Sequence, residues 1–320
     1  MQVIRQLPEK PIKPCVLALG NFDGVHLGHR RLLESGLQIA RKMGIGLSVL
    51  LYEPHPLKVL FPEKMIGLLT TSEERLKLLE LIGVDTVYLL PFNHDTANIP
   101  PETFVSDILV RLGTRYAMVG FNYSFGAKGK GSPEDLQRLG PKYGFGVSVL
   151  QAQTMGGEVI SSSSIRQALL QGDMRQAQKM LGRYPFLCGR VIHGEQRGRD
   201  LGYPTANLEV CEDLLVPKPG SYAVWAEFDG QKVMGMLNIG KKPTFHTEYE
   251  TTVEVHLLNF YGNLYDKMLS MYLVERLRDE RKFSSINELL NQLQKDKEHT
   301  QRVLEDEGEL DLRENALYKS

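Results

Sequence analysis

Two histidines, His26 and His29, lie on either side of Gly28 in the segment GNFDGVHLGHRRLL, residues 20–33. The segment joins a buried-strand pattern to a helical one. The start of a helix offers unpaired backbone N–H groups and the positive end of the helix dipole. Imidazole donors there could stabilise negative charge that grows on an α-phosphate while pyrophosphate leaves. This pattern indicates a nucleotide-binding turn.

An isolated histidine pair more often caps a helix or lies on the surface, because short motifs have many false positives. The glycines around this pair reverse that expectation, since they let the backbone approach a ligand closely. Helical zinc sites place their histidines four residues apart, so His26 and His29 do not fit one.

A second candidate element is ISSSSIRQALLQGD, residues 160–173, where serines precede an amphipathic helix pattern. Its hydroxyls, its backbone N–H groups and the forked cation of Arg166 suit β- and γ-phosphate oxygens. Alone, the segment fits an ordinary helix cap. Together with the histidine turn, Ser162, Ser163 and Arg166 suggest the other half of a triphosphate clamp.

A glycine-rich basic loop, GRVIHGEQRGRDLGYPTANL, spans residues 189–208. Gly194 and Gly198 make the backbone of this loop flexible, and Arg199 could reach phosphates. The hydroxyl of Thr205 and the amide oxygen of Asn207 are hard ligands of the kind that Mg²⁺ accepts. No Walker A motif occurs in the sequence, which argues against a P-loop ATPase.

A single carboxylate, Glu254, lies in the alternating segment TTVEVHLL, with Val253 and Val255 on the opposite face. It could accept the proton of an attacking hydroxyl during phosphoryl transfer. Taken alone, a charged residue in such a strand is more often simply exposed to solvent.

The elements that must position these residues alternate between strand and helix patterns in the first half, which favours a parallel sheet with helices on both faces. Strand patterns lie at 15–20, 46–53, 85–92, 116–120 and 145–153, and helix patterns follow 27, 71, 101 and 132. The first helix pattern places Leu33, Leu37, Ala40 and Met43 on one face.

After residue 184, about six strand patterns follow one another, which suggests a barrel or sandwich. Asp229-Gly230 between two of them predicts a hairpin. A last helix near 284–304 carries Ile286, Leu289, Leu290, Leu293 and Val303 on its apolar side. We expect domains at 1–184 and 185–306, then an acidic tail at 307–320.

The composition agrees with two domains, because 320 residues exceed what one core usually serves. Lys and Arg (38) balance Asp and Glu (39), so no global field attracts nucleic acid or membranes. The three cysteines lack a zinc spacing, and neither a signal peptide nor a membrane span is apparent. We expect a cytoplasmic protein without nucleic-acid or membrane partners. The oligomeric state is left open, with a transient homo-oligomer as one alternative.

The first half resembles the adenylyltransferase half of bacterial bifunctional riboflavin kinase/FMN adenylyltransferases, through its GxFDGVHxGH loop, its EPHP turn, its VGFNYSFGAKGKG loop and its ISSSxIR segment. The resemblance implies a Rossmann-like nucleotidyltransferase domain in which His26, His29 and Arg166 act in catalysis. It implies ATP binding by Gly20, Asn21, Phe22, Asp23, Gly28, Ser162 and Ser163. It implies FMN binding by His55, Asn122 and Phe125.

The second half resembles the riboflavin kinase module of the same family, through GxVxHGxxxGRxLGxPTAN, VEVHLLNFYGNLY and ERLRDERKF. The resemblance implies a six-stranded barrel with a C-terminal helix. Thr205 and Asn207 would bind Mg-ATP with Gly194, Gly198 and Arg199, and Glu254 would be the base for the riboflavin 5′-hydroxyl. Arg278 and Phe283 would contact the flavin. The substrates would be riboflavin, FMN and ATP, with Mg²⁺ as cofactor and FAD as final product.

Three alternatives stay open. The first domain could adenylate another phosphate, or the chain could be a flavin-sensing regulatory protein. Only one of the two heads could be active, because the chain departs from the family pattern at Asn122, Ser124, Asn263 and Asp266.

Overall fold

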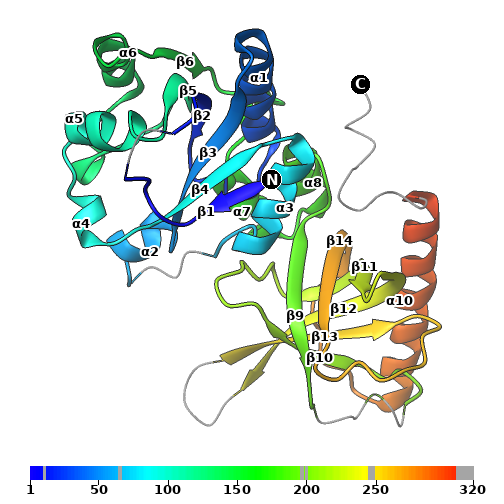
Figure 1. The fold of residues 1–320 in the computed structure, drawn as a ribbon. Coiled ribbons are helices and arrows are strands. Elements are labelled where there is room, and N and C mark those ends of the chain that lie inside the picture. The colour runs from blue at the N-terminus through cyan, green and yellow to red at the C-terminus, as the bar shows by residue number, and fades with distance from the viewer. Residues whose placement is uncertain (10–11, 64–66, 195–197, 199–200, 244–248, 308–320) are drawn as a thin grey trace. The chain divides into compact units, whose positions relative to one another are not determined.

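The structure, a computed structural model, describes residues 1–9, 12–63, 67–194, 198, 201–243 and 249–307 (Figure 1). The chain divides into two compact units. Unit 1 comprises Met1–Ile66 and Ser72–Ser161, and unit 2 comprises Gly67–Thr71 and Ser162–Ser320. Residues 162–184 therefore contact the second unit more than the first, and the boundary expected at 184 stays a prediction.

Unit 1 is built on a parallel sheet of six strands in the order β1-β4-β3-β2-β5-β6. The strands are β1 (Gln2–Ile4), β2 (Cys15–Leu19), β3 (Gly46–Glu53), β4 (Thr86–Pro91), β5 (Thr114–Gly120) and β6 (Gly146–Leu150). This Rossmann-like arrangement confirms the parallel sheet that the alternating pattern predicts.

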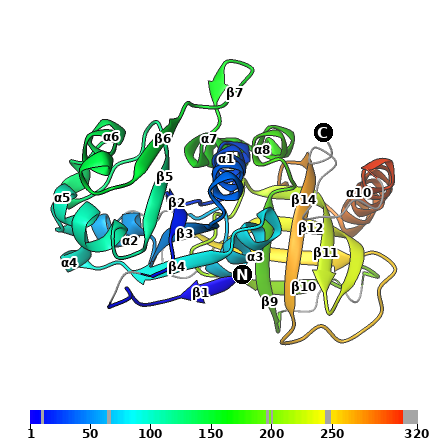
Figure 2. The ribbon, with the colours of Figure 1, turned by 45° about the horizontal axis from the view of Figure 1, so that its top comes forward.

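Helices cover both faces of this sheet, because the side chains of its strands alternate between two cores. Val16 and Ala18 of β2 belong to one hydrophobic cluster, and Leu17 and Leu19 belong to the other. The first cluster includes buried residues of α1 (Leu27–Met43) and α3 (Ser72–Ile82), and the second includes buried residues of η1 (Phe104–Leu109) and α6 (Pro133–Lys142). Figure 2 shows α1 and α6 on opposite sides of the sheet. Leu33 and Ala40 of α1 are buried, whereas Met43, where α1 ends, is 44% exposed.

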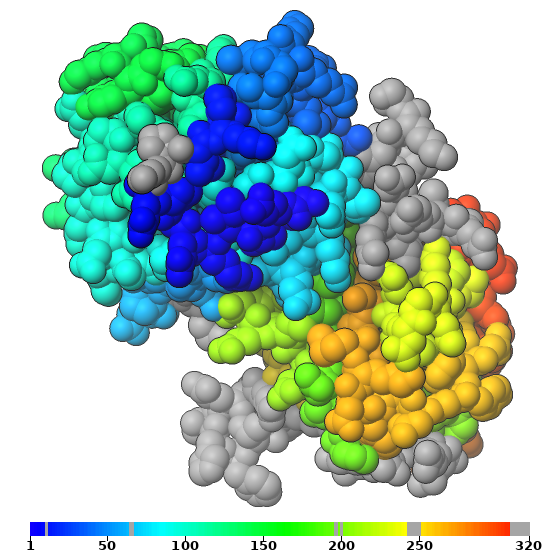
Figure 3. Space-filling model, viewed as in Figure 1, coloured from blue at the N-terminus to red at the C-terminus, as the bar shows by residue number. Residues whose placement is uncertain are grey.

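Two parts of unit 1 differ from the expected elements. The single helix expected from residue 101 is a short α5 (Pro101–Thr103) that continues as the π-helix η1. The strand β1 was not expected, because three residues are too few to show the alternation of a strand. It pairs with β4 and lies at the surface (Figure 3). The remaining elements are α2 (Pro56–Leu60), α4 (His94–Ala97), η2 (Ala127–Gly129), β7 (Thr154–Met155) and β8 (Glu158–Val159).

Unit 2 contains a closed antiparallel barrel in the strand order β10-β13-β12-β11-β14-β9, as the run of strand patterns suggests. The strands are β9 (Phe186–Ile192), β10 (Ala206–Val210), β11 (Gly220–Phe228), β12 (Gln231–Pro243), β13 (Tyr249–Leu257) and β14 (Met268–Arg278). Asp229 and Gly230 join β11 to β12 with φ values of 48° and 74°. The predicted hairpin is confirmed.

Among the described residues, α10 (Ile286–Glu307) and α8 (Met174–Leu181) contact the strands of this barrel. Val303 and Leu304 of α10 join Trp225 and Tyr272 in a cluster on the outside of the barrel. Ile286, expected on the apolar side of α10, is 63% exposed instead. The helices α7 (Ser162–Gln171) and α8 contact each other, and α8 contacts β14.

Removing side-chain volume beneath α10 tests its contribution to unit 2. Leu304 is fully buried, so Leu304→Ala is expected to lower the free energy of unfolding by about 2–5 kcal/mol through lost burial and a cavity. Ile286→Ala on the same helix is expected to change it by less than about 0.5 kcal/mol. Urea unfolding followed by circular dichroism measures both. Equal losses would mean that α10 is not held through its Leu304 face.

Candidate functional sites

In unit 1, the predicted site residues follow three neighbouring strands. The turn of His26 and His29 follows β2, the Pro54-His55-Pro56 turn follows β3, and the loop with Asn122 follows β5. In the sheet, β2 lies between β3 and β5. Because the carboxyl ends of parallel strands meet at one edge, the topology brings these segments to a common edge, where ligands bind in such sheets.

The turn after β2 has an unusual backbone. Phe22 and Val25 have φ values of 49° and 39°, a region that non-glycine residues seldom adopt. The ring of Phe22 is fully buried in the cluster under α1, which fixes the turn against the core. This strained turn holds the start of α1 at the sheet edge.

The two histidines are packed together at the start of α1. Nδ1 of His26 accepts a hydrogen bond from the backbone N–H of His29 at 3.3 Å, so His26 caps the helix. The two rings stack with centroids 3.6 Å apart and an angle of 16°. A Cβ atom at Gly28 would lie 3.2 Å from the His26 ring, so glycine gives this stack its room. Both imidazoles therefore lie beside the helix N-terminus.

Asp23, expected among the ATP-binding residues, is buried beside a guanidinium group. Its carboxylate lies 3.5 Å from Nη2 of Arg75 on α3, and both side chains are at most 5% exposed. Sequence reasoning missed Arg75, because a cation in the charged helix segment SEERLK predicts a solvent-facing residue. The ion pair ties the turn to α3, and contact of Asp23 with ATP stays a prediction.

The residues expected to bind FMN have different surroundings. His55 is 6% exposed and accepts a hydrogen bond from the N–H of Leu57 at 3.2 Å, as the cap of α2. Asn122 is exposed. Phe125 is 5% exposed and packs on Phe104 in the core at a centroid distance of 5.3 Å. Their binding of FMN stays a prediction, and the buried ring of Phe125 has a clear packing role.

Ser162, Ser163 and Arg166 all lie in the first turns of α7, which belongs to unit 2. Nε of Arg166 donates to the carbonyl oxygen of Gly67 at 2.7 Å. The expected clamp would join these residues to the histidines of unit 1, and it stays a prediction.

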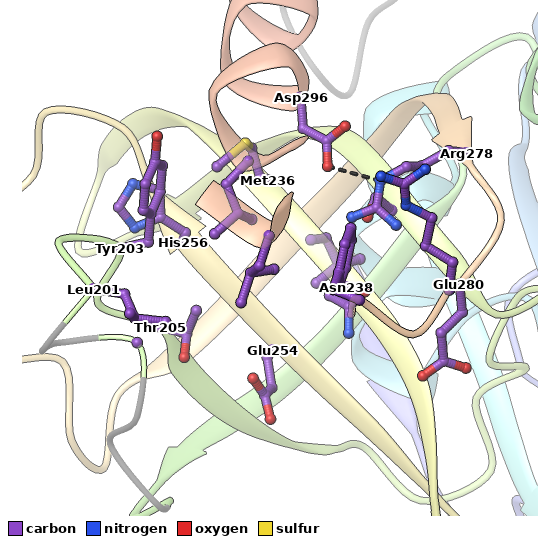
Figure 4. Close-up of a pocket in the computed structure, with 17 residues that line it drawn as sticks. Leu201, Tyr203, Thr205, Met236, Asn238, Glu254, His256, Arg278, Glu280 and Asp296 are labelled. Carbon is purple, nitrogen blue, oxygen red and sulfur yellow. Dashed lines mark hydrogen bonds and ion pairs between the residues drawn. The ribbon is translucent and has the colours of Figure 1, made fainter. Parts of the chain in front are cut away.

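Unit 2 contains a cavity of about 300 Å³ between the barrel, α10 and the chain that follows β14 (Figure 4). Five of the predicted residues line it, namely Gly198, Thr205, Glu254, Arg278 and Phe283. Leu201, Tyr203, Asn238, His256, Arg281, Leu293 and Asp296 are among its other lining residues. Unit 2 thus brings together residues that are far apart in the sequence, from Gly198 to Asp296.

Strand register explains why Glu254 faces outward. Val253 and Val255 are 3% and 1% exposed, whereas Glu254 is half-buried and lines the cavity. Glu254 pairs with Asn207 on β10 and with Asn238 on β12. Directly paired residues share a face of the sheet, so the three polar side chains form one row across the barrel. Sequence reasoning missed Asn238, although its place in alternating β12 would have marked it as outward-facing.

The chain before β10 is held close to this row. A Cβ atom at Gly194 would lie 2.0 Å from Nδ2 of Asn207, so any other residue there would have to displace the Asn207 amide group. His256 shares a 2.8 Å hydrogen bond with the carbonyl oxygen of Pro204, and Nδ1 must be the donor because a carbonyl only accepts. Burial lowers the pKa of His256. His256 thereby positions the backbone next to Thr205, while Arg199 lies outside the described residues.

The oxygen donors near Glu254 suit magnesium. A threonine hydroxyl and an amide oxygen are hard, neutral ligands, and Mg²⁺ binds through few protein ligands while it keeps its waters. Thr205 lines the cavity and Asn207 pairs with Glu254, so the donor set fits. Within the described ranges, no cluster of three or more His, Cys, Asp or Glu side chains could hold a metal.

Among the residues that the structure describes, no helix is both long enough and apolar enough to cross a membrane.

Comparisons with known proteins cover both units. A family model described as FAD synthetase matches residues 9–164, and one described as riboflavin kinase matches residues 181–304. A Listeria monocytogenes protein named bifunctional riboflavin kinase/FMN adenylyltransferase is 38% identical over 287 residues, which cover 89% of this chain and 91% of that protein. An Escherichia coli K12 protein of the same name is 38% identical over 296 residues, which cover 92% and 94%.

One solved structure is also similar over most of its length. It is described as a macrolide-efflux protein from Streptococcus pneumoniae, and it is 31% identical with a TM-score of 0.86. The match covers 93% of this chain and 98% of that one.

Replacing Arg75 tests the anchor of the histidine turn. Arg75→Leu removes the guanidinium beside the buried carboxylate of Asp23, and such changes cost about 3–5 kcal/mol of unfolding free energy. Arg138→Leu breaks an exposed pair with Asp135 and is expected to lower the unfolding free energy far less. Thermal and urea unfolding compare the two. A loss for Arg75→Leu as small as the control's would contradict an anchoring role.

Proposed function

The chain belongs to the family of bifunctional riboflavin kinase/FMN adenylyltransferases, and on this premise we propose which of its residues carry out each reaction. It phosphorylates riboflavin to FMN with ATP. It then transfers AMP from ATP to FMN, which gives FAD and pyrophosphate. One observation carries the residue assignment furthest: Thr205, Glu254, Arg278 and Phe283 line a single cavity beside the barrel.

In the kinase reaction, Glu254 accepts the proton of the riboflavin 5′-hydroxyl while the hydroxyl oxygen attacks the γ-phosphorus of ATP. The bond from that phosphorus to the β,γ-bridging oxygen breaks, and ADP leaves. Thr205 and Asn207 would hold Mg²⁺, which supplies charge neutralisation at the β- and γ-phosphates. Gly194, Gly198 and Arg199 bind ATP in this proposal.

The flavin end of the same site is made of aromatic and cationic groups. The guanidinium groups of Arg278 and Arg281 lie 5.6 Å and 4.7 Å from the ring centroid of Phe283. An aromatic ring and planar cations suit a planar, apolar ring system with polar edges. Arg278 and Phe283 therefore bind the flavin in this proposal.

In the adenylyl transfer, the FMN phosphate attacks the α-phosphorus of ATP and pyrophosphate leaves. His26 and His29 donate to the phosphate oxygens, beside the N-terminus of α1. Ser162, Ser163 and Arg166 bind the β- and γ-phosphates. Further contacts to ATP come from the turn itself, and FMN is bound by His55, Asn122 and Phe125.

The proposal extends to the organisation of the chain and its surroundings. In this proposal the chain comprises an adenylyltransferase domain at 1–184, a kinase domain at 185–306 and an acidic tail at 307–320. The protein acts in the cytoplasm on small-molecule substrates. Its net charge of -1 supports such substrates over nucleic-acid or membrane partners.

Replacing the proposed base separates the two activities. Glu254→Gln keeps the shape of the side chain but cannot take a proton, so FMN formation is expected to fall by about 10²- to 10⁴-fold. Conversion of supplied FMN to FAD is expected to stay unchanged. Glu209→Gln, an exposed carboxylate on neighbouring β10, is the matched control. Chromatography of the flavins measures both steps, and retained kinase activity in Glu254→Gln would reject the role of the base.

Replacing a histidine of the turn is expected to impair the other reaction, the formation of FAD. Because His29→Ala removes a donor to the phosphate that gains charge, FAD formation is expected to fall by about 10²- to 10³-fold. FMN formation from riboflavin is expected to persist. His94→Ala, an exposed histidine on α4, serves as the control. The assignment of His29 is wrong if both steps decline together while the protein stays folded.

A further inference from the structure

Arg278 lies at the end of β14 with its guanidinium group held on two sides. Nε donates to Oδ2 of Asp296 at 2.8 Å (Figure 4), and Nη1 donates to the carbonyl oxygen of Asp279 at 3.1 Å. The side chain of Arg278 is 19% exposed and lines the cavity. Among the described residues, these bonds use Nε and Nη1, which leaves Nη2 for an acceptor in the cavity.

Asp296 belongs to α10 and is 5% exposed, unlike the other acids of that helix. Both of its oxygens are engaged, because Nε2 of Gln292 donates to Oδ1 at 2.7 Å while Arg278 binds Oδ2. Removing a carboxylate from water costs several kcal/mol, and even a well-paired buried ion pair is weak evidence for stability. Burial of Asp296 therefore calls for a reason other than stabilising the fold.

Anchoring α10 is not that reason. Val303 and Leu304, about two turns further along the helix, supply its apolar contact with Trp225 and Tyr272. Asp296 instead faces the cavity, where its partner Arg278 also lies. A guanidinium group on three flexible methylenes has many orientations, and one fixed carboxylate selects among them.

We propose that Asp296 is a positioning residue for the kinase reaction. It orients Arg278 so that the free edge of the guanidinium group donates to the flavin substrate, and Gln292 in turn orients Asp296. The proposal rests on the kinase function proposed for the cavity. It adds a carboxylate that acts through Arg278 and touches neither ATP nor the attacking hydroxyl.

The test compares steady-state kinase kinetics of Asp296→Ala and Asp296→Asn in the full-length protein. Losing one hydrogen bond to a charged group is expected to raise the KM for riboflavin by about 10- to 100-fold in Asp296→Ala. The KM for ATP and the rate of FMN adenylylation are expected to change by less than about 2-fold. Asp296→Asn keeps an acceptor oxygen for Nε, so partial rescue, to within about 5-fold of the wild-type KM, is expected.

The control is Glu305→Ala, an exposed acid on the same helix, which should leave every parameter unchanged. A merely structural role of Asp296 would lower kcat and raise both KM values together, with no rescue by asparagine, and would overturn the proposal. So would an unchanged KM for riboflavin in Asp296→Ala.

A double-mutant cycle keeps the test decisive if Asp296→Ala does not fold. Asp296→Asn and Arg278→Lys are each expected to raise the KM for riboflavin, and the double variant should be no worse than Arg278→Lys alone, because the two residues act in series. Additive effects would overturn the proposal. Failure of the underlying function is distinguishable, since Glu254→Gln would then retain kinase activity.

Discussion

Successive side chains of a strand point to opposite faces, and the candidate chemistry of both units depends on this constraint. Every residue of β2 is buried, with Val16 and Ala18 in one core and Leu17 and Leu19 in the other. Polar and glycine residues can follow only where the strand ends, which is where the histidine turn begins. In β13 the same constraint directs Val253 and Val255 inward and Glu254 outward, beside Asn207 and Asn238.

In each unit a buried carboxylate pairs with a guanidinium group beside the candidate site. Asp23 and Arg75 connect the histidine turn to α3, and Asp296 and Arg278 connect α10 to the end of β14. Such pairs contribute little net stability, because desolvation offsets most of the attraction. Their common feature is a geometric restraint, because Arg75 holds the carboxylate of Asp23 in the histidine turn and Asp296 holds the guanidinium group of Arg278.

Periodic patterns made the regular elements predictable from the sequence. The strand expected at 46–53 agrees with β3, and the succession of strand patterns after 184 agrees with the barrel. The π-helix η1 could not be foreseen, because its apolar spacing resembles that of an α-helix. The burial of Arg75 and Asp296 could not be foreseen either, since charged helix residues are usually exposed. Their ion-pair partners come close only in the folded chain.

The central claim is that one chain makes FMN and then FAD from riboflavin. The most direct measurement incubates the purified protein with riboflavin and Mg-ATP and follows the flavins by chromatography over time. We expect FMN to appear first and FAD then to accumulate with release of pyrophosphate. FMN that accumulates without FAD, or the absence of any turnover, would contradict it.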